Sequence, residues 1–191
     1  MTTFSIFPKF LKTVRNLALV TFLMPFASLL AAQTTDSPEI NELLKQIKTH
    51  AALADRDGEK LLSYTNSKIP WQAHASRLTQ IKVHANNLIE DFNQMSALRD
   101  QGSEWQQDVI DQIGPRLQTM SSHLSATIEH LNGNQNRLAL PEYRDYVRTN
   151  SEFLHNTYRM ISDYLDYGEA KSKADMLEKR LALTQPETSG A

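Results

Sequence analysis

The chain has 191 residues, the length of a single domain. It contains no cysteine, which excludes disulfides, thiolate chemistry, iron–sulfur clusters and covalently attached c-type haem. It carries 20 basic and 22 acidic residues with both signs interspersed, and this balance argues against a nucleic-acid partner.

The first 32 residues have the layout of a secretory signal peptide. A basic segment without acidic residues precedes the apolar run 17–32, which ends in two alanines. We expect cleavage after Ala32, a short linker at 33–36, and a product that is exported to the periplasm of a Gram-negative bacterium or secreted. The alternative is an uncleaved anchor, although about 16 apolar residues interrupted by Pro25 are few for a hydrocarbon core of about 30 Å. Membrane contact is expected only if this segment is retained.

Four segments with heptad-like apolar spacing follow, and none alternates with period two for long enough to predict a strand. They predict one domain over 37–183, with a disordered tail at 184–191 and helices at about 38–66, 70–100, 104–138 and 141–182. Long helices joined by short links predict an all-α fold, an antiparallel up-down-up-down four-helix bundle with coiled-coil-like stripes.

The first two helices have clear signals. Ser37 followed by Pro38 predicts an N-cap and a first helical position. The second helix has the most regular stripe, whose members recur every seven residues in two interleaved series: Trp71, Leu78, Ala85 and Phe92, and His74, Ile81, Leu88 and Met95. Gly102 suits the left-handed position after this helix.

The third helix is expected to begin with a capping box at Ser103–Gln106. Pro115 lies inside its stripe without changing the register, so we expect a kinked helix and not a broken one. Gly133 allows an earlier end, but we expect the helix to continue to about Leu138.

The fourth helix is expected to begin at Pro141, which suits a first helical position. Its apolar stripe runs far enough to include Leu177 and Leu181 in the core. Its first turns combine aromatic and charged residues that often contribute to protein interfaces. The predicted interaction face consists of Tyr143, Arg144, Tyr146 and Arg148.

Four histidines, one on each helix, are predicted at a similar height. Residues equally distant from a turn lie side by side in antiparallel helices, and this rule aligns His50, His84, His123 and His155. Imidazoles between the helices of a bundle bind transition metals or b-type haem. However, each histidine lies beside a core position, which favours helix borders over one shared centre.

Other polar residues fall at or near core positions and predict a polar layer at one end of the bundle, formed by His74, His130, Asn134 and Asn150. A buried imidazole at His74 needs a hydrogen-bond partner, which His130, Glu129 or a hydroxyl of a neighbouring helix could supply. Polar residues at core positions often fix helix register, so we interpret this layer as structural, with a ligand site at His74 as the alternative.

Three segments carry a resemblance to known sequences: WQAHASRLTQIKVHANNL (71–88), TIEHLNGNQNRL (127–138) and EYRDYVRTN (142–150). They resemble those of uncharacterised secreted helical proteins of soil bacteria. The resemblance implies an exported α-helical domain, and it supplies neither an activity nor any site residue.

The sequence contains no GxSxG, no glycine-rich phosphate loop and no HExxH. We therefore predict a non-enzymatic, exported helical bundle without a cofactor that acts through contacts with a protein or envelope partner. The competing hypothesis is a periplasmic bundle that binds a transition metal or b-type haem through the four aligned histidines.

Overall fold

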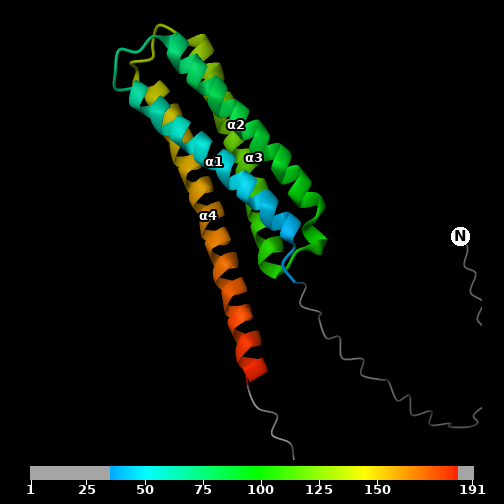
Figure 1. Ribbon diagram of the computed structural model, residues 1–191. Coiled ribbons are helices and arrows are strands. Elements are labelled where there is room, and N and C mark those ends of the chain that lie inside the picture. Colours follow the sequence, from blue (N-terminus) through cyan, green and yellow to red (C-terminus); the bar gives the residue numbers. More distant parts are fainter. Residues whose placement is uncertain (1–34, 185–191) are drawn as a thin grey trace, which may run out of the picture. The chain divides into compact units, whose positions relative to one another are not determined.

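The computed structural model describes residues 35–184 (Figure 1). The predicted signal peptide, the start of the linker and the predicted tail from residue 185 lie outside the described residues. Residues 35–184 contain no β-strand, and the elements in chain order are α1 (Pro38–Tyr64), α2 (Trp71–Ala97), the short 3₁₀ helix η1 (Arg99–Gln101), α3 (Glu104–Gly133) and α4 (Pro141–Thr184). The predicted all-α fold with four long helices is confirmed. None of these described helices combines the length and apolarity needed to cross a membrane.

Two helix starts follow the predicted signals. Ser37 is the N-cap of α1, where its hydroxyl accepts a hydrogen bond from the Ile40 backbone N–H at 3.4 Å, and Pro38 occupies the first position. Before α3, the Gln106 side chain accepts a hydrogen bond from the Ser103 backbone N–H at 3.0 Å. These bonds satisfy backbone donors that the first turn of a helix leaves without a partner.

The end of α3 differs from the prediction. The helix ends at Gly133 and does not continue to Leu138. Asn134 leaves the helical conformation with φ −134° and ψ 33°, and its side chain donates to the carbonyl of His130 at 3.0 Å. An asparagine side chain that bonds to nearby backbone competes with helix propagation, and this competition explains the early end.

Gly102 also differs from the prediction. Its backbone is extended, with φ −85° and ψ 155°, so the expected left-handed conformation is wrong. The position instead requires a small residue, because a Cβ there would lie 2.9 Å from Cδ1 of Ile40.

Neighbouring helices run in opposite directions along the chain. Between α1 and α2, His50 lies near Asp91 whereas Asp57 lies near Arg77. The same reversal joins α4 to α1 and to α3, through the pairs Asp55–His155, Thr65–Arg144, Trp105–Tyr167 and His130–Tyr143. Gly114 of α3 lies against Phe92 of α2, which completes a ring in the order α1, α2, α3, α4.

The core lies between the four helices and follows the predicted stripes. Large side chains with less than 2% exposure include Ile40, Leu44, Ile47, Leu61, Leu78, Ile81, Leu88, Met95, Ile113, Met120 and Leu131. Burying each such side chain stabilises the fold by about 1.5–3 kcal/mol relative to leaving it in water. Trp71 and Phe92, the first and last members of one of the two predicted series of α2, are only half-buried at the margin of the core.

The last part of α4 lies outside this core. All side chains from Glu169 to Leu183 are exposed, and Figure 1 shows α4 continuing past the ends of the other helices. Leu177 is 45% and Leu181 65% exposed, so the expectation that they extend the core is wrong. The heptad spacing continues, but no other described helix reaches far enough to cover it. We call residues 169–183 the α4 extension.

Candidate functional site

The four aligned histidines occupy three separate places. His50 and His84 stack across the border of α1 and α2, with ring centroids 6.4 Å apart. His155 lies at the border of α4 and α1, where its Nδ1 is 3.3 Å from Oδ2 of Asp55. His123 packs against Phe153 of α4 with ring centroids 5.0 Å apart. The four imidazoles therefore do not share one centre for a metal or a haem iron.

A row of charged side chains lies along the border of α1 and α2. Arg77 donates to Oδ1 of Asp57 at 2.7 Å, and Nε2 of His84 lies 3.5 Å from the other oxygen of the same carboxylate. About two helical turns away, Nε2 of His50 lies 3.7 Å from Oδ2 of Asp91. Asp57 is only 4% exposed, so Arg77 compensates a carboxylate that would otherwise be buried without a countercharge. We interpret this row as an element that fixes the register of the two helices.

The predicted polar layer is divided between two places. At the first, His74 is 1% exposed and its Nδ1 lies 3.0 Å from the hydroxyl of Tyr143. The ring of His130 also stacks on the tyrosine, with ring centroids 6.0 Å apart. Burial lowers the pKa of His74 and raises the pKa of Tyr143. Both residues are therefore neutral near pH 7, and they satisfy each other inside the core.

Asn150 lies apart from these residues, whereas Asn134 lies beside His130. Asn134 is the residue at the end of α3 that is described above. Asn150 is 2% exposed, and its amide nitrogen donates to Oγ1 of Thr127 and to the carbonyls of His123 and Tyr146, both at 3.1 Å. Asn150 thus connects α4 to α3 one to two helical turns away from Tyr143 and His130.

The predicted interaction face requires a correction, because Tyr143 is fully buried. It occupies the core stripe that continues with Val147, and only Tyr146, at 39% exposure, presents an aromatic ring at the surface here. Arg144 donates to the carbonyl of Thr65 at 3.3 Å, and Arg148 pairs with Asp145 at 2.6 Å. Three of the four predicted residues therefore remain at the surface, and all three have partners within the chain, because the Tyr146 ring packs against His130 with centroids 4.8 Å apart.

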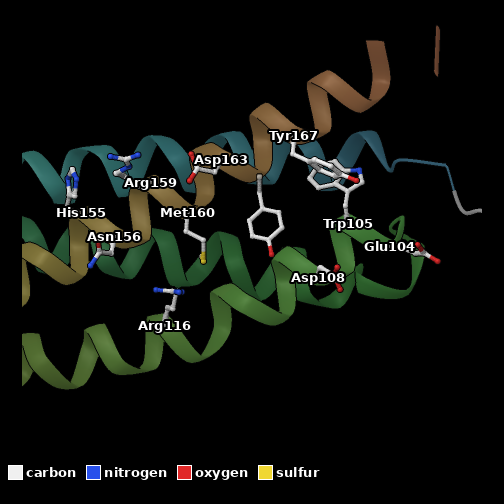
Figure 2. A pocket seen from close by; sticks show the side chains of 11 residues that line it. Glu104, Trp105, Asp108, Arg116, His155, Asn156, Arg159, Met160, Asp163 and Tyr167 are labelled. Carbon is white, nitrogen blue, oxygen red and sulfur yellow. The ribbon is translucent and has the colours of Figure 1, made fainter. Parts of the chain in front are cut away.

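An open groove of about 860 Å³ lies along the border of α3 and α4 (Figure 2). Its aromatic wall consists of Trp105, Tyr164 and Tyr167, and its charged lining consists of Glu104, Asp108, Arg116, Arg159 and Asp163. Figure 2 shows His155 at one end of this row and Trp105 with Glu104 at the other. The lining mixes both signs of charge, so it has no clear preference for an anion or a cation.

Trp105 is held firmly at its end of the groove. Its indole N–H donates to Asp36 at 2.8 Å, and its ring meets Tyr167 edge to face with centroids 6.2 Å apart. A Cβ at Gly168 would lie 2.6 Å from the indole ring, so the ring packs directly on the α4 backbone. The sequence shows no spacing that would have identified this contact.

A second cluster joins α1 to α4 and includes one of the predicted histidines. One ligand atom each of Asp55, Glu59 and His155 lies within 4.8 Å of the other two. Our sequence reasoning missed the carboxylates, although Asp55 and Glu59 stand one helical turn apart and therefore share a face of α1. The missing information was that the face of α1 bearing them lies against α4.

No protein-family model, curated protein or solved structure matches this chain. The function must therefore be argued from the residues themselves.

Proposed function

We propose that this protein is a non-enzymatic, exported helical bundle that binds a protein partner through the α4 extension. The observation that carries the proposal is the exposure of large apolar side chains on the part of α4 that extends beyond the core of the bundle. Met176 is 60% exposed and Leu183 87%, in addition to the two leucines described above. Isolated large apolar residues are ordinary on a surface, but a succession of them on one projecting helix indicates an interface.

The spacing of the α4 extension favours a helical partner. Ala170, Ala174, Leu177 and Leu181 follow one another at intervals of four, three and four residues, which is the pattern of a coiled-coil seam. The two alanines would allow close approach at one end, and the leucines would supply most of the apolar contact at the other.

The length of the α4 extension supports the same conclusion. Helices shorter than about 12–15 residues are marginal in water, and most helices in proteins are stabilised by packing an apolar face. The extension is of about this length, and all its side chains from Glu169 to Leu183 are exposed. A partner helix would supply it, with about 1.5–3 kcal/mol for each leucine that becomes buried.

Export is part of the proposal and rests on residues 1–32, which combine a basic start, an apolar run and a small-residue end. Expression of the full chain in a Gram-negative host, followed by fractionation and intact-mass measurement, tests it. We expect a periplasmic or secreted product that lacks residues 1–32. A full-length product in the cytoplasm would contradict export, whereas a full-length product in the membrane would indicate a retained anchor.

The partner is tested by placing a photo-crosslinking amino acid at position 177 in the producing cells. The control places it at position 83, because Val83 on α2 is 50% exposed but lies on the body of the bundle. We expect a protein adduct from position 177 that position 83 does not give. An absence of adducts, or the same adducts from both positions, would contradict the proposal.

A quantitative measurement must follow, because an adduct alone does not establish an interface. The captured protein, purified separately, should bind the unmodified chain and should bind a Leu177→Glu variant at least tenfold more weakly. A Val83→Glu variant is the matched control and should bind like the original chain. Equal affinity of all three would overturn the assignment of the α4 extension as the binding surface.

A further inference from the structure

We infer that Asp55, Glu59 and His155 form a binding site for a divalent transition metal, with zinc as the ion that fits best. The site lies between α1 and α4, on the body of the bundle, and it does not depend on the proposed role of the α4 extension.

The geometry is close to that of a three-ligand centre. Nδ1 of His155 and Oδ2 of Asp55 are 3.3 Å apart. Two ligands of a tetrahedral zinc ion with bonds of about 2.0–2.1 Å lie about 3.3 Å from each other, so this pair already has the required spacing. Glu59 supplies the third ligand atom, which lies within 4.8 Å of a ligand atom of each of the other two residues, and its exposed side chain can move closer.

The state of Asp55 is an independent argument for a bound cation. Asp55 is 8% exposed, and its Oδ1 is buried without any hydrogen-bond partner among the described residues. A buried carboxylate oxygen without a partner is unfavourable, and native structures rarely leave one without a reason. A metal ion bound to this carboxylate would supply the missing charge.

A comparison with Asp57, two residues further along α1, shows what Asp55 lacks. Asp57 is also buried, but Arg77 contributes a permanent positive charge at 2.7 Å. Within residues 35–184, Asp55 has no lysine or arginine nitrogen within 4.0 Å, and its ion-pair partner is His155, which carries a charge only when protonated. Both aspartates are therefore buried, but only Asp57 has a permanent positive charge beside it.

The donor set selects the class of metal. One imidazole nitrogen and two carboxylate oxygens suit zinc and its neighbours among the divalent transition metals. Calcium takes six to eight oxygen ligands, and magnesium keeps several of its waters around few protein oxygens. The partial exposure of Glu59 and His155 leaves a further position open to water or to an external ligand. His155 also lines the α3–α4 groove, so a bound ion would lie near the end of that groove (Figure 2).

The test is a zinc titration of the purified, chelator-stripped protein without a polyhistidine tag, in competition with a chromophoric chelator. We expect one zinc ion per chain and at least tenfold weaker binding for Glu59→Gln and for His155→Ala. His123→Ala is the control, because His123 is a histidine at a different helix border, where it packs against Phe153, and this variant should bind zinc like the original chain. Zinc should also raise the thermal unfolding midpoint of the original protein and of His123→Ala, but not that of the two ligand variants.

Glu59 keeps the test valid if changes at His155 or Asp55 disturb the fold, because its exposed carboxylate can be neutralised without altering the core. Three results would overturn the inference: no stoichiometric zinc on the original protein, unchanged binding by Glu59→Gln, or equal weakening by His123→Ala and His155→Ala. Tighter binding of calcium or magnesium than of zinc would overturn the assignment to a transition metal.

Discussion

Gln106 binds both backbone groups of Ser37, a residue 69 positions earlier in the chain. Its Oε1 accepts from the Ser37 N–H at 2.8 Å, and its Nε2 donates to the Ser37 carbonyl at 2.9 Å. The same side chain also accepts from the Ser103 N–H and donates to Asn41, and it is 0% exposed. One amide thus joins the first turn of α1 to the first turn of α3.

Replacing this amide with a hydrocarbon should destabilise the protein strongly. Gln106→Leu removes the hydrogen-bond partner of the half-buried Ser37 N–H and of the buried Ser103 N–H, and an unpaired buried group costs about 1–3 kcal/mol. We expect the free energy of unfolding in urea to fall by roughly 2–4 kcal/mol. Gln118→Leu, at an exposed position of the same helix, is the control and should change it by less than about 0.5 kcal/mol. Amide hydrogen exchange should quicken at residues 40–43 in the first variant alone, and unchanged protection there would contradict this role of Gln106.

The pair His74–Tyr143 predicts a dependence of stability on pH. Burial lowers the pKa of His74 in the folded protein, whereas the unfolded chain has the ordinary value of about 6.5. Below this value the unfolded state binds a proton that the folded state does not, so this histidine makes the protein less stable as the pH falls. The test measures the unfolding free energies of the original protein and of His74→Gln from pH 7.5 to 5. As the pH falls, the stability of His74→Gln relative to that of the original protein should rise. A constant difference would show that His74 does not titrate in this way.

The contact between Gly168 and Trp105 predicts opposite effects of the same substitution at two glycines. Gly168→Ala would place a methyl group 2.6 Å from the indole ring, and overpacking of this kind costs about 1–3 kcal/mol. Gly133→Ala meets no atom within 4 Å at the end of α3, and an alanine there should stabilise the helix by up to about 1 kcal/mol. Urea unfolding measures both changes. In a Trp71→Phe background, the tryptophan fluorescence should shift for Gly168→Ala only, and equal stability of the two variants would contradict direct packing at Gly168.

The helices and the core could be predicted from the sequence because their signals are local. Ser37 with Pro38 marks the start of α1, Pro141 marks the start of α4, and the seven-residue spacing identifies the side chains that share a face. His74 was expected on the core stripe and is buried there. Its partner is the hydroxyl of Tyr143, which the sequence reasoning had placed on the surface. Position along one helix is a local property, whereas the identity of a partner depends on the neighbouring helix.

The limits of the sequence are clearest where the same spacing has two outcomes. Leu177 and Leu165 both follow the apolar stripe of α4, yet Leu165 is 6% exposed and Leu177 is 45% exposed. Periodicity indicates which face is apolar, but it does not say where the neighbouring helices end. Asp55 was missed for a related reason, because the alignment of helices by their turns is accurate only to about one turn. A pair of atoms 3.3 Å apart requires a finer register than this.

The ion pair Arg77–Asp57 provides a test of whether the charged row between α1 and α2 fixes register or merely occupies space. The Arg77 side chain is 24% exposed and the Asp57 side chain 6%, so solvent screens this pair only in part. Arg77→Met keeps the apolar stem and leaves a buried carboxylate without its main countercharge, and we expect it to cost about 1–3 kcal/mol. Asp57→Leu removes the carboxylate. In a double-mutant cycle, the double variant should lose less stability than the sum of the losses of the two single variants, by about 0.5–3 kcal/mol. The exposed pair Arg148–Asp145 is the control, where the coupling should stay below about 0.5 kcal/mol. Additive effects at Arg77 and Asp57 would mean that the burial of Asp57, and not its attraction to Arg77, determines the energetics of this border.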